Sequence, residues 1–106
     1  ERIRQRVIAA REIQSRRYAY YKDIHCNAQM TERMIHQFAE PDSEGLTLLR
    51  TAMEQLKLSA RAYSRILKVA RTIADLDGSE QVRALHISEA VSYRQLDWGD
   101  WAERGL

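Results

Sequence analysis

Apolar residues recur every three or four positions along most of the chain, and no stretch alternates apolar and polar residues as a half-buried strand would. The pattern predicts an all-α fold, a bundle of about five helices near residues 2–20, 31–39, 43–57, 59–76 and 84–96. Pro41 and Gly78 mark two of the breaks. We expect residues 1–98 to form one helical domain and residues 99–106 a frayed tail.

Residues that cap helices stand before three of these segments. Thr31, Asp42 or Ser43, and Ser59 can each accept a hydrogen bond from a backbone amide of the first turn. Arg83, before the last segment, is a poor cap. The first segment also lacks a capping residue, which is what a helix continuing from a longer chain would show.

The segment 59–76 has the widest apolar face of the chain. At about 100° per residue, apolar and polar side chains fall into two separate arcs, each about half of the circumference. The apolar arc predicts that this helix lies at the centre of the domain. We expect the other helices to cover it with their inward faces. These faces consist of Ile3, Val7, Ala10, Gln14, Tyr18 and Tyr21; Met34, Ile35 and Phe38; Leu46, Leu49, Ala52, Met53 and Leu56; and Ile87, Ala90, Val91 and Leu96.

The polar arc of the same segment is basic. Arg61, Arg65 and Lys68 are spaced by four and three, so they project from one face, whereas Arg71 can pair with Asp75 one turn away. Arg61 stands in the first turn, where the helix dipole disfavours a positive charge. Two interpretations follow from the spacing. The arc is either a solvated face with salt bridges between helices, or it meets an external anion or a partner's carboxylate.

Charge is distributed unevenly along the chain. Residues 1–22 contain seven Lys or Arg and two Glu, although the whole chain carries a net charge of only +2. A basic first helix suits nucleic acid, an acidic partner or solvent. The segment RRYAYYK mixes Tyr18, Tyr20 and Tyr21 with cations, as stacking surfaces for bases do, although helical spacing favours packing of Tyr18 and Tyr21 on the core.

Several classes of site find no support in the sequence. His25, Cys26, His36 and His86 form no compact ligand pair, so we expect no metal site, a buried Cys26 and a packing or hydrogen-bonding role for His86. There is no G-x-x-x-x-G-K-[ST] loop and no nucleophile elbow, so the chain by itself is not expected to be an enzyme. No apolar run is long enough for a membrane span, and a single cysteine fits the reducing cytoplasm.

Residues 58–94 carry a recognisable pattern, LSARAYSRILKVARTIADLDGSEQV followed by HISEAVSYR. They resemble the carboxy-terminal domain of the magnesium-chelatase-like AAA+ ATPases of the ComM/YifB type. The stretch IRQRVIAAREIQSRRY and the pair Asn27-Ala28 are also similar to that family. The resemblance extends to about Trp98.

The resemblance implies a role for the chain within a longer bacterial protein. The chain would be the helical lid that follows a Lon-protease-like domain and an AAA+ core with Walker A and Walker B motifs. Such a protein would be a cytoplasmic homo-oligomer, expected to be a hexamer, that binds ATP with Mg²⁺ and acts on DNA in natural transformation. The family name implies kinship and not insertion of magnesium into a porphyrin.

The resemblance also implies a role for individual residues. Lids of AAA+ ATPases carry a sensor-2 arginine near the start of a helix in an S-x-R setting, which Ser59-Ala60-Arg61 matches. Arg61 is therefore the candidate to contact nucleotide phosphate, in its own subunit or in a neighbouring one, and Arg65 and Lys68 are weaker candidates. Two other functions stay open, namely a DNA-binding module that uses the basic first helix, and a purely structural oligomer interface.

Overall fold

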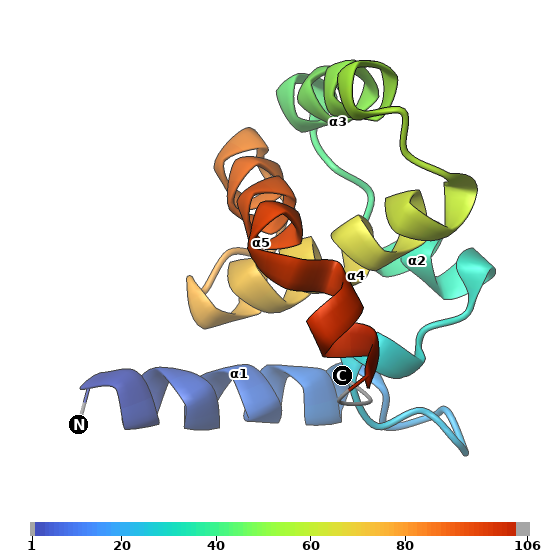
Figure 1. Ribbon diagram of the computed structural model, residues 1–106. Coiled ribbons are helices and arrows are strands. Elements are labelled where there is room, and N and C mark those ends of the chain that lie inside the picture. The colour runs from blue at the N-terminus through green and yellow to red at the C-terminus, as the bar shows by residue number, and fades with distance from the viewer. Residues whose placement is uncertain (1, 104–106) are drawn as a thin grey trace.

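The computed structural model describes the backbone of residues 2–103 and the side chains of residues 2–93, and it is a bundle of helices (Figure 1). The order is α1 (Arg2–Arg17), the 3-10 helix η1 (Asn27–Gln29), α2 (Glu32–Phe38), α3 (Ser43–Leu56), α4 (Ala60–Leu76) and α5 (Ala84–Glu103). Within residues 2–103 the only β-type pairing is an isolated bridge between Pro41 and Val82. The prediction of an all-α bundle is confirmed.

Helix α4 is the centre of the bundle, as its wide apolar arc predicts. Helices α1, α2 and α5 and the 3-10 helix η1 all pack against it, and α3 packs against α5. Figure 1 shows α1 and α3 at opposite ends, with α4 and α5 between them. The buried core is assembled from α2, α3, α4 and α5 and from residues in the connections between helices. It comprises Tyr18, Met30, Met34, Ile35, Ala39, Leu49, Ile66, Leu67, Ala70, Ala74, Val82, Ile87 and Ala90.

The predicted caps are present. Thr31, Asp42 and Ser59 accept hydrogen bonds from the amides of Met34, Gly45 and Ala62 at 3.3, 2.8 and 3.2 Å. Gly78 ends α4 with a φ of 70°, in the left-handed region that glycine adopts without strain. The amides of Gly78 and Ser79 bond back to the carbonyls of Asp75 and Ala74, which is the Schellman arrangement.

Helix α5 begins without a capping Ser, Thr or Asp, and His86 replaces that function. The Nδ1 atom of His86 accepts a hydrogen bond from the backbone amide of Arg83 at 2.9 Å, as a Glu does in a capping box. Because Nδ1 accepts, the proton lies on Nε2, which donates to Asp77 at 3.0 Å. His86 is completely buried, so its expected hydrogen-bonding role is confirmed.

Two predicted helix boundaries were wrong. Helix α1 ends at Arg17 rather than near residue 20, because the chain turns at residues 18–20 so that Tyr18 can enter the core. Helix α5 continues to Glu103, so the predicted tail from residue 99 is helical that far. The inward position expected for Leu96 and the end of the tail, residues 104–106, lie outside the described side chains and backbone, respectively.

Two predictions of burial were also wrong. Ile3 is 78 % exposed, because the first turn of α1 extends past the end of α4. Cys26 is exposed, because it stands in extended conformation just before η1 and Asn27 takes the buried position instead. By contrast, Tyr18 and Tyr21 pack on the core and make edge-to-face contacts with Phe38, as helical spacing predicted.

A buried polar network centred on Asp75 joins α1, η1 and α4. Arg17 donates two hydrogen bonds to the Asp75 carboxylate, at 2.7 and 2.9 Å, and Arg71 forms an ion pair with it at 3.0 Å. The expected pairing of Arg71 with Asp75 is therefore confirmed, but the bidentate partner is Arg17. Asp75 and Arg71 are each 2 % exposed, so these charges are held away from water.

Asn27 connects the same network to the core. Its amide nitrogen donates to Asp75 at 2.9 Å and to Thr72 at 3.1 Å, and its carbonyl oxygen accepts from Arg17 at 3.0 Å and from Tyr18 at 2.6 Å. Burial raises the pKa of Tyr18, so its hydroxyl keeps the proton that it donates. Asn27 is thus fully satisfied although it is 1 % exposed.

The cost of removing a guanidinium from water is offset in different ways for Arg17 and Arg71. Burial opposes the charge of Arg17, but hydrogen bonds and the charge of Asp75 raise its pKa above the ordinary value. Burial lowers the pKa of Arg71 despite Asp75. The guanidinium of Arg71 is held mainly by the carbonyls of Phe38, Ser79 and Glu80, at 3.0, 2.7 and 3.0 Å. Arg71 therefore ties the end of α2 and the loop after α4 to the centre.

We predict that Asp75→Asn destabilises the domain by about 3–5 kcal/mol, because it leaves the buried Arg71 and the partly buried Arg17 without a counter-charge. Chemical denaturation of the domain measures the change. The matched control is Asp23→Asn, since Asp23 is exposed and has no ion pair within the described side chains. A loss below about 1 kcal/mol for Asp75→Asn would show that the network is not a main source of stability.

Candidate functional site

The polar arc of α4 changes from exposed to buried along the helix. Arg61 is exposed, Arg65 and Lys68 are half-buried, and Arg71 and Asp75 are buried. The reason is that η1 and α1 cover the carboxy-terminal half of the arc, where Thr72 bonds to Asn27. The basic part of the arc is therefore accessible to solvent only in the first half of α4.

Arg61 is the second residue of α4, directly after the capping residue Ser59 and Ala60. The chain enters this helix through Lys57, whose left-handed conformation ends α3 with a φ of 51°. Among the side chains of residues 2–93, none forms an ion pair or hydrogen bond with Arg61. Its guanidinium is thus available for a ligand outside the domain, at a position where the helix dipole gives it no support.

Arg65 and Lys68 follow Arg61 along the same side of α4. Neither makes a hydrogen bond or ion pair with the part of the chain whose side chains are described. Their neighbour Ser64 donates to Glu32 at 2.6 Å, which fixes the start of α2 beside this row. We call Arg61, Arg65 and Lys68 the basic row. Three guanidinium or ammonium groups without counter-charges form a surface suited to phosphate or carboxylate.

A second basic surface lies at the turn after α1. Tyr20 is 98 % exposed, in contrast to Tyr18 and Tyr21. The residues of this turn border a hollow of about 460 Å³, which Lys22 and His25 also line. The exposed cations Arg16 and Lys22 flank Tyr20. An exposed ring beside cations can stack on a base while the cations hold phosphates.

Sequence reasoning missed Arg17 and Asn27 as the residues that fix this architecture. A cation at the end of the first helix looks favourable for the dipole alone, and an Asn before a short helix looks like a turn residue. Asn27 was noticed only through the family resemblance. One signal in the sequence was Asp75, the acidic residue among the four cations of the segment 59–76. Such a carboxylate can pair with more cations than Arg71 alone.

Two other kinds of feature are absent from the part of the chain that the structure describes. Within the described residues, no three His, Cys, Asp or Glu side chains gather as metal ligands would. In that part of the chain no helix combines the length and hydropathy needed to cross a bilayer.

Known proteins resemble this chain over nearly its whole length. Residues 1–94 match the family described as magnesium chelatase, subunit ChlI C-terminal. An uncharacterized protein, YifB, of Escherichia coli K12 is 44 % identical over 95 residues, which are 90 % of this chain and 18 % of the relative. The competence protein ComM of Haemophilus influenzae is 38 % identical over 94 residues, 89 % of this chain and again 18 % of the relative.

The extent of these matches has two consequences. The chain spans about a fifth of the length of the curated relatives, and the matched part is the carboxy-terminal one by the family's description. The expected relationship to the ComM/YifB type is confirmed. On the match of residues 1–94, the chain belongs to the magnesium chelatase ChlI carboxy-terminal domain family and is the carboxy-terminal domain of a magnesium-chelatase-like protein.

Proposed function

We propose that this domain is the helical lid of a cytoplasmic, oligomeric AAA+ ATPase, and that Arg61 contacts a phosphate of ATP bound with Mg²⁺ at the core. The observation that carries the proposal is Arg61 itself. It is an exposed guanidinium in the first turn of the central helix, without a partner among the side chains of residues 2–93. The family and the ComM relative support the setting.

A rigid fold would allow the domain to act as a lid. Arg61 belongs to the same helix as Arg71 and Asp75, which the buried network locks to α1, η1 and α2. A force applied to the guanidinium by a phosphate would therefore move the whole domain and not a single side chain. Arg61 can donate two hydrogen bonds to phosphate oxygens, with Arg65 and Lys68 adding positive charge behind it.

The first test is Arg61→Ala in the full-length protein. A hydrogen bond to a charged group contributes about 1.5–3 kcal/mol, so its loss should lower kcat/KM for ATP about 10- to 100-fold. The same variant should keep the helical content and unfolding midpoint of the parent, because the exposed Arg61 makes no hydrogen bond or ion pair within the described side chains. A steady-state ATPase assay and circular dichroism provide the two measurements.

Arg33→Ala is the matched control, since Arg33 is an exposed arginine on α2 that likewise has no partner within the described side chains, and turnover should stay unchanged. Arg61→Lys separates charge from geometry, because a lysine cannot make the bidentate contact. Normal turnover by Arg61→Ala hexamers refutes the nucleotide contact. Loss of assembly with normal turnover in the remaining hexamers supports the structural-interface alternative.

A second candidate function, contact with DNA, rests on a different observation. Tyr20 presents its ring to solvent in the turn that follows α1, a helix that carries six of the chain's seventeen Lys and Arg residues. Stacking of one base on such a ring contributes about 1–3 kcal/mol. Both functions are compatible, because the basic row and Tyr20 belong to different segments of the domain.

We predict that Tyr20→Ala weakens binding of single-stranded DNA to the full-length protein by that amount, about 1–3 kcal/mol, whereas Tyr20→Phe, which keeps the ring, binds as the parent does. Fluorescence anisotropy at several salt concentrations measures both the affinity and the number of phosphate contacts, because affinity falls with salt as counterions are released. Equal binding by Tyr20→Ala and the parent removes this function from the turn.

A further inference from the structure

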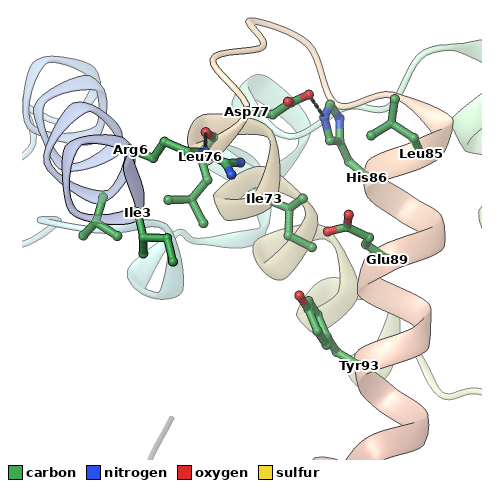
Figure 2. Close-up of a pocket in the computed structure, with 10 residues that line it drawn as sticks. Ile3, Arg6, Ile73, Leu76, Asp77, Leu85, His86, Glu89 and Tyr93 are labelled. Atoms are coloured by element: carbon green, nitrogen blue, oxygen red, sulfur yellow. Dashed lines mark hydrogen bonds and ion pairs between the residues drawn. The ribbon is translucent and has the colours of Figure 1, made fainter. Parts of the chain in front are cut away.

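A groove lined by both apolar and charged side chains lies between the first turns of α1 and α5, with α4 as its floor (Figure 2). It has a volume of about 350 Å³. Ile3 is 78 % exposed, Leu85 50 % and Tyr93 40 %, so three of the large exposed apolar side chains line one hollow. Ile73 and Leu76 form its base. Scattered exposed apolar residues are ordinary, but a group of them around a hollow marks a contact surface.

The walls of the groove are fixed in place. Arg6 donates from Nε to the carbonyl of Leu76 at 3.0 Å, which attaches the first turns of α1 to the end of α4. On the other side, the hydrogen bond between His86 and Asp77 attaches the start of α5 to the same end of α4. Figure 2 shows both interactions, at opposite edges of an open space. The groove is therefore a preformed feature and not a gap that closes by side-chain rotation.

The charges at the groove indicate the chemistry of its occupant. Glu89 extends toward the open space in Figure 2 and forms no ion pair within the described side chains. The Asp77 carboxylate is half exposed and also borders the groove, whereas Arg6 places one cation on the α1 side. A segment with apolar side chains for Ile3, Leu85 and Tyr93, and a lysine or arginine for Glu89, matches this surface.

The position of the groove indicates which segment this is. The matched part is carboxy-terminal and covers 18 % of each relative's length, so most of a relative's chain precedes the residue that corresponds to Glu1. That chain would join the domain at the first turn of α1, which carries Ile3 and forms one wall of the groove. A segment attached there begins beside the groove, so its effective concentration at the groove is high.

We propose that the groove binds the segment of the same chain that immediately precedes α1, through apolar side chains and a cation paired with Glu89. This docking fixes the angle at which the domain leaves the preceding part of the protein. The contact is separate from the basic row on α4 and does not depend on Arg61 touching a nucleotide.

The test places a photo-crosslinking amino acid at Leu85 of the full-length protein, with Leu48 as the matched control. Leu48 is a similarly exposed leucine, 37 % against 50 %, on α3, and it does not line the groove. After irradiation, we expect Leu85 to give a product with the mobility of a single chain, joined to a peptide from just before α1, at several times the yield of Leu48. Mass spectrometry of the digested product identifies the peptide.

Other outcomes of the crosslinking contradict the proposal. A product with the mobility of two chains would mean that a second copy occupies the groove. A product within one chain, but joined to a distant segment, would mean a different intramolecular contact. A yield no higher than that of Leu48 would mean that the groove is empty.

A substitution provides an independent readout in the same protein. Leu85→Asp should expel the segment and increase tryptic cleavage at Arg2 and Arg4 several-fold, whereas Leu48→Asp should leave the cleavage rate unchanged. ATP turnover by the basic-row variants is measured separately, so failure of one proposal leaves the other standing. Equal cleavage of Leu85→Asp and the parent would overturn the docking of the preceding segment.

Discussion

The Asp75 carboxylate is the interaction on which this architecture depends. It accepts from Arg17 of α1 and from Asn27 of η1, and it forms an ion pair with Arg71 of its own helix. The buried Arg71 and the partly buried Arg17 share one carboxylate, so the excess positive charge must be satisfied elsewhere. The backbone carbonyls that Arg71 reaches do this, and they belong to α2 and to the loop after α4. The contacts that neutralise these charges are therefore also the contacts that hold α1, α2 and η1 to α4.

This network also decides which cations are available for function. Arg17 and Arg71 both pair with Asp75 and are not available to an outside ligand. In the sequence, Arg17 belongs to the basic first helix and Arg71 to the basic arc of α4. The first half of α4 extends beyond the cover of η1 and α1, and there Arg61 is exposed while Arg65 and Lys68 are half-buried. The buried half of the arc thus holds the helix rigidly, and its exposed half is free to contact a phosphate or a partner.

The two ends of α4 would serve different contacts. Its start carries the basic row, whereas its end forms the floor of the groove between α1 and α5. If a nucleotide contacts the start of α4 and the preceding chain contacts its end, α4 would transmit movement from one contact to the other. The Asp75 network would keep the helix rigid during this movement. The ring of Tyr20 projects from the turn after α1, which keeps a DNA contact separate from both ends.

Periodicity alone predicted the helical class, the central place of α4, and the caps at Thr31, Asp42 and Ser59, because these depend on local spacing and local hydrogen bonds. It also predicted the pairing of Arg71 with Asp75, since one helical turn separates them. Local rules could not predict that Arg17, 58 residues from Asp75, is the bidentate partner, that Asn27 rather than Cys26 is buried, or that Ile3 lines an open groove. Each of these depends on which helix covers which part of α4. Only the packing of distant segments settles that, because burial and charge pairing depend on neighbours in space and not along the chain.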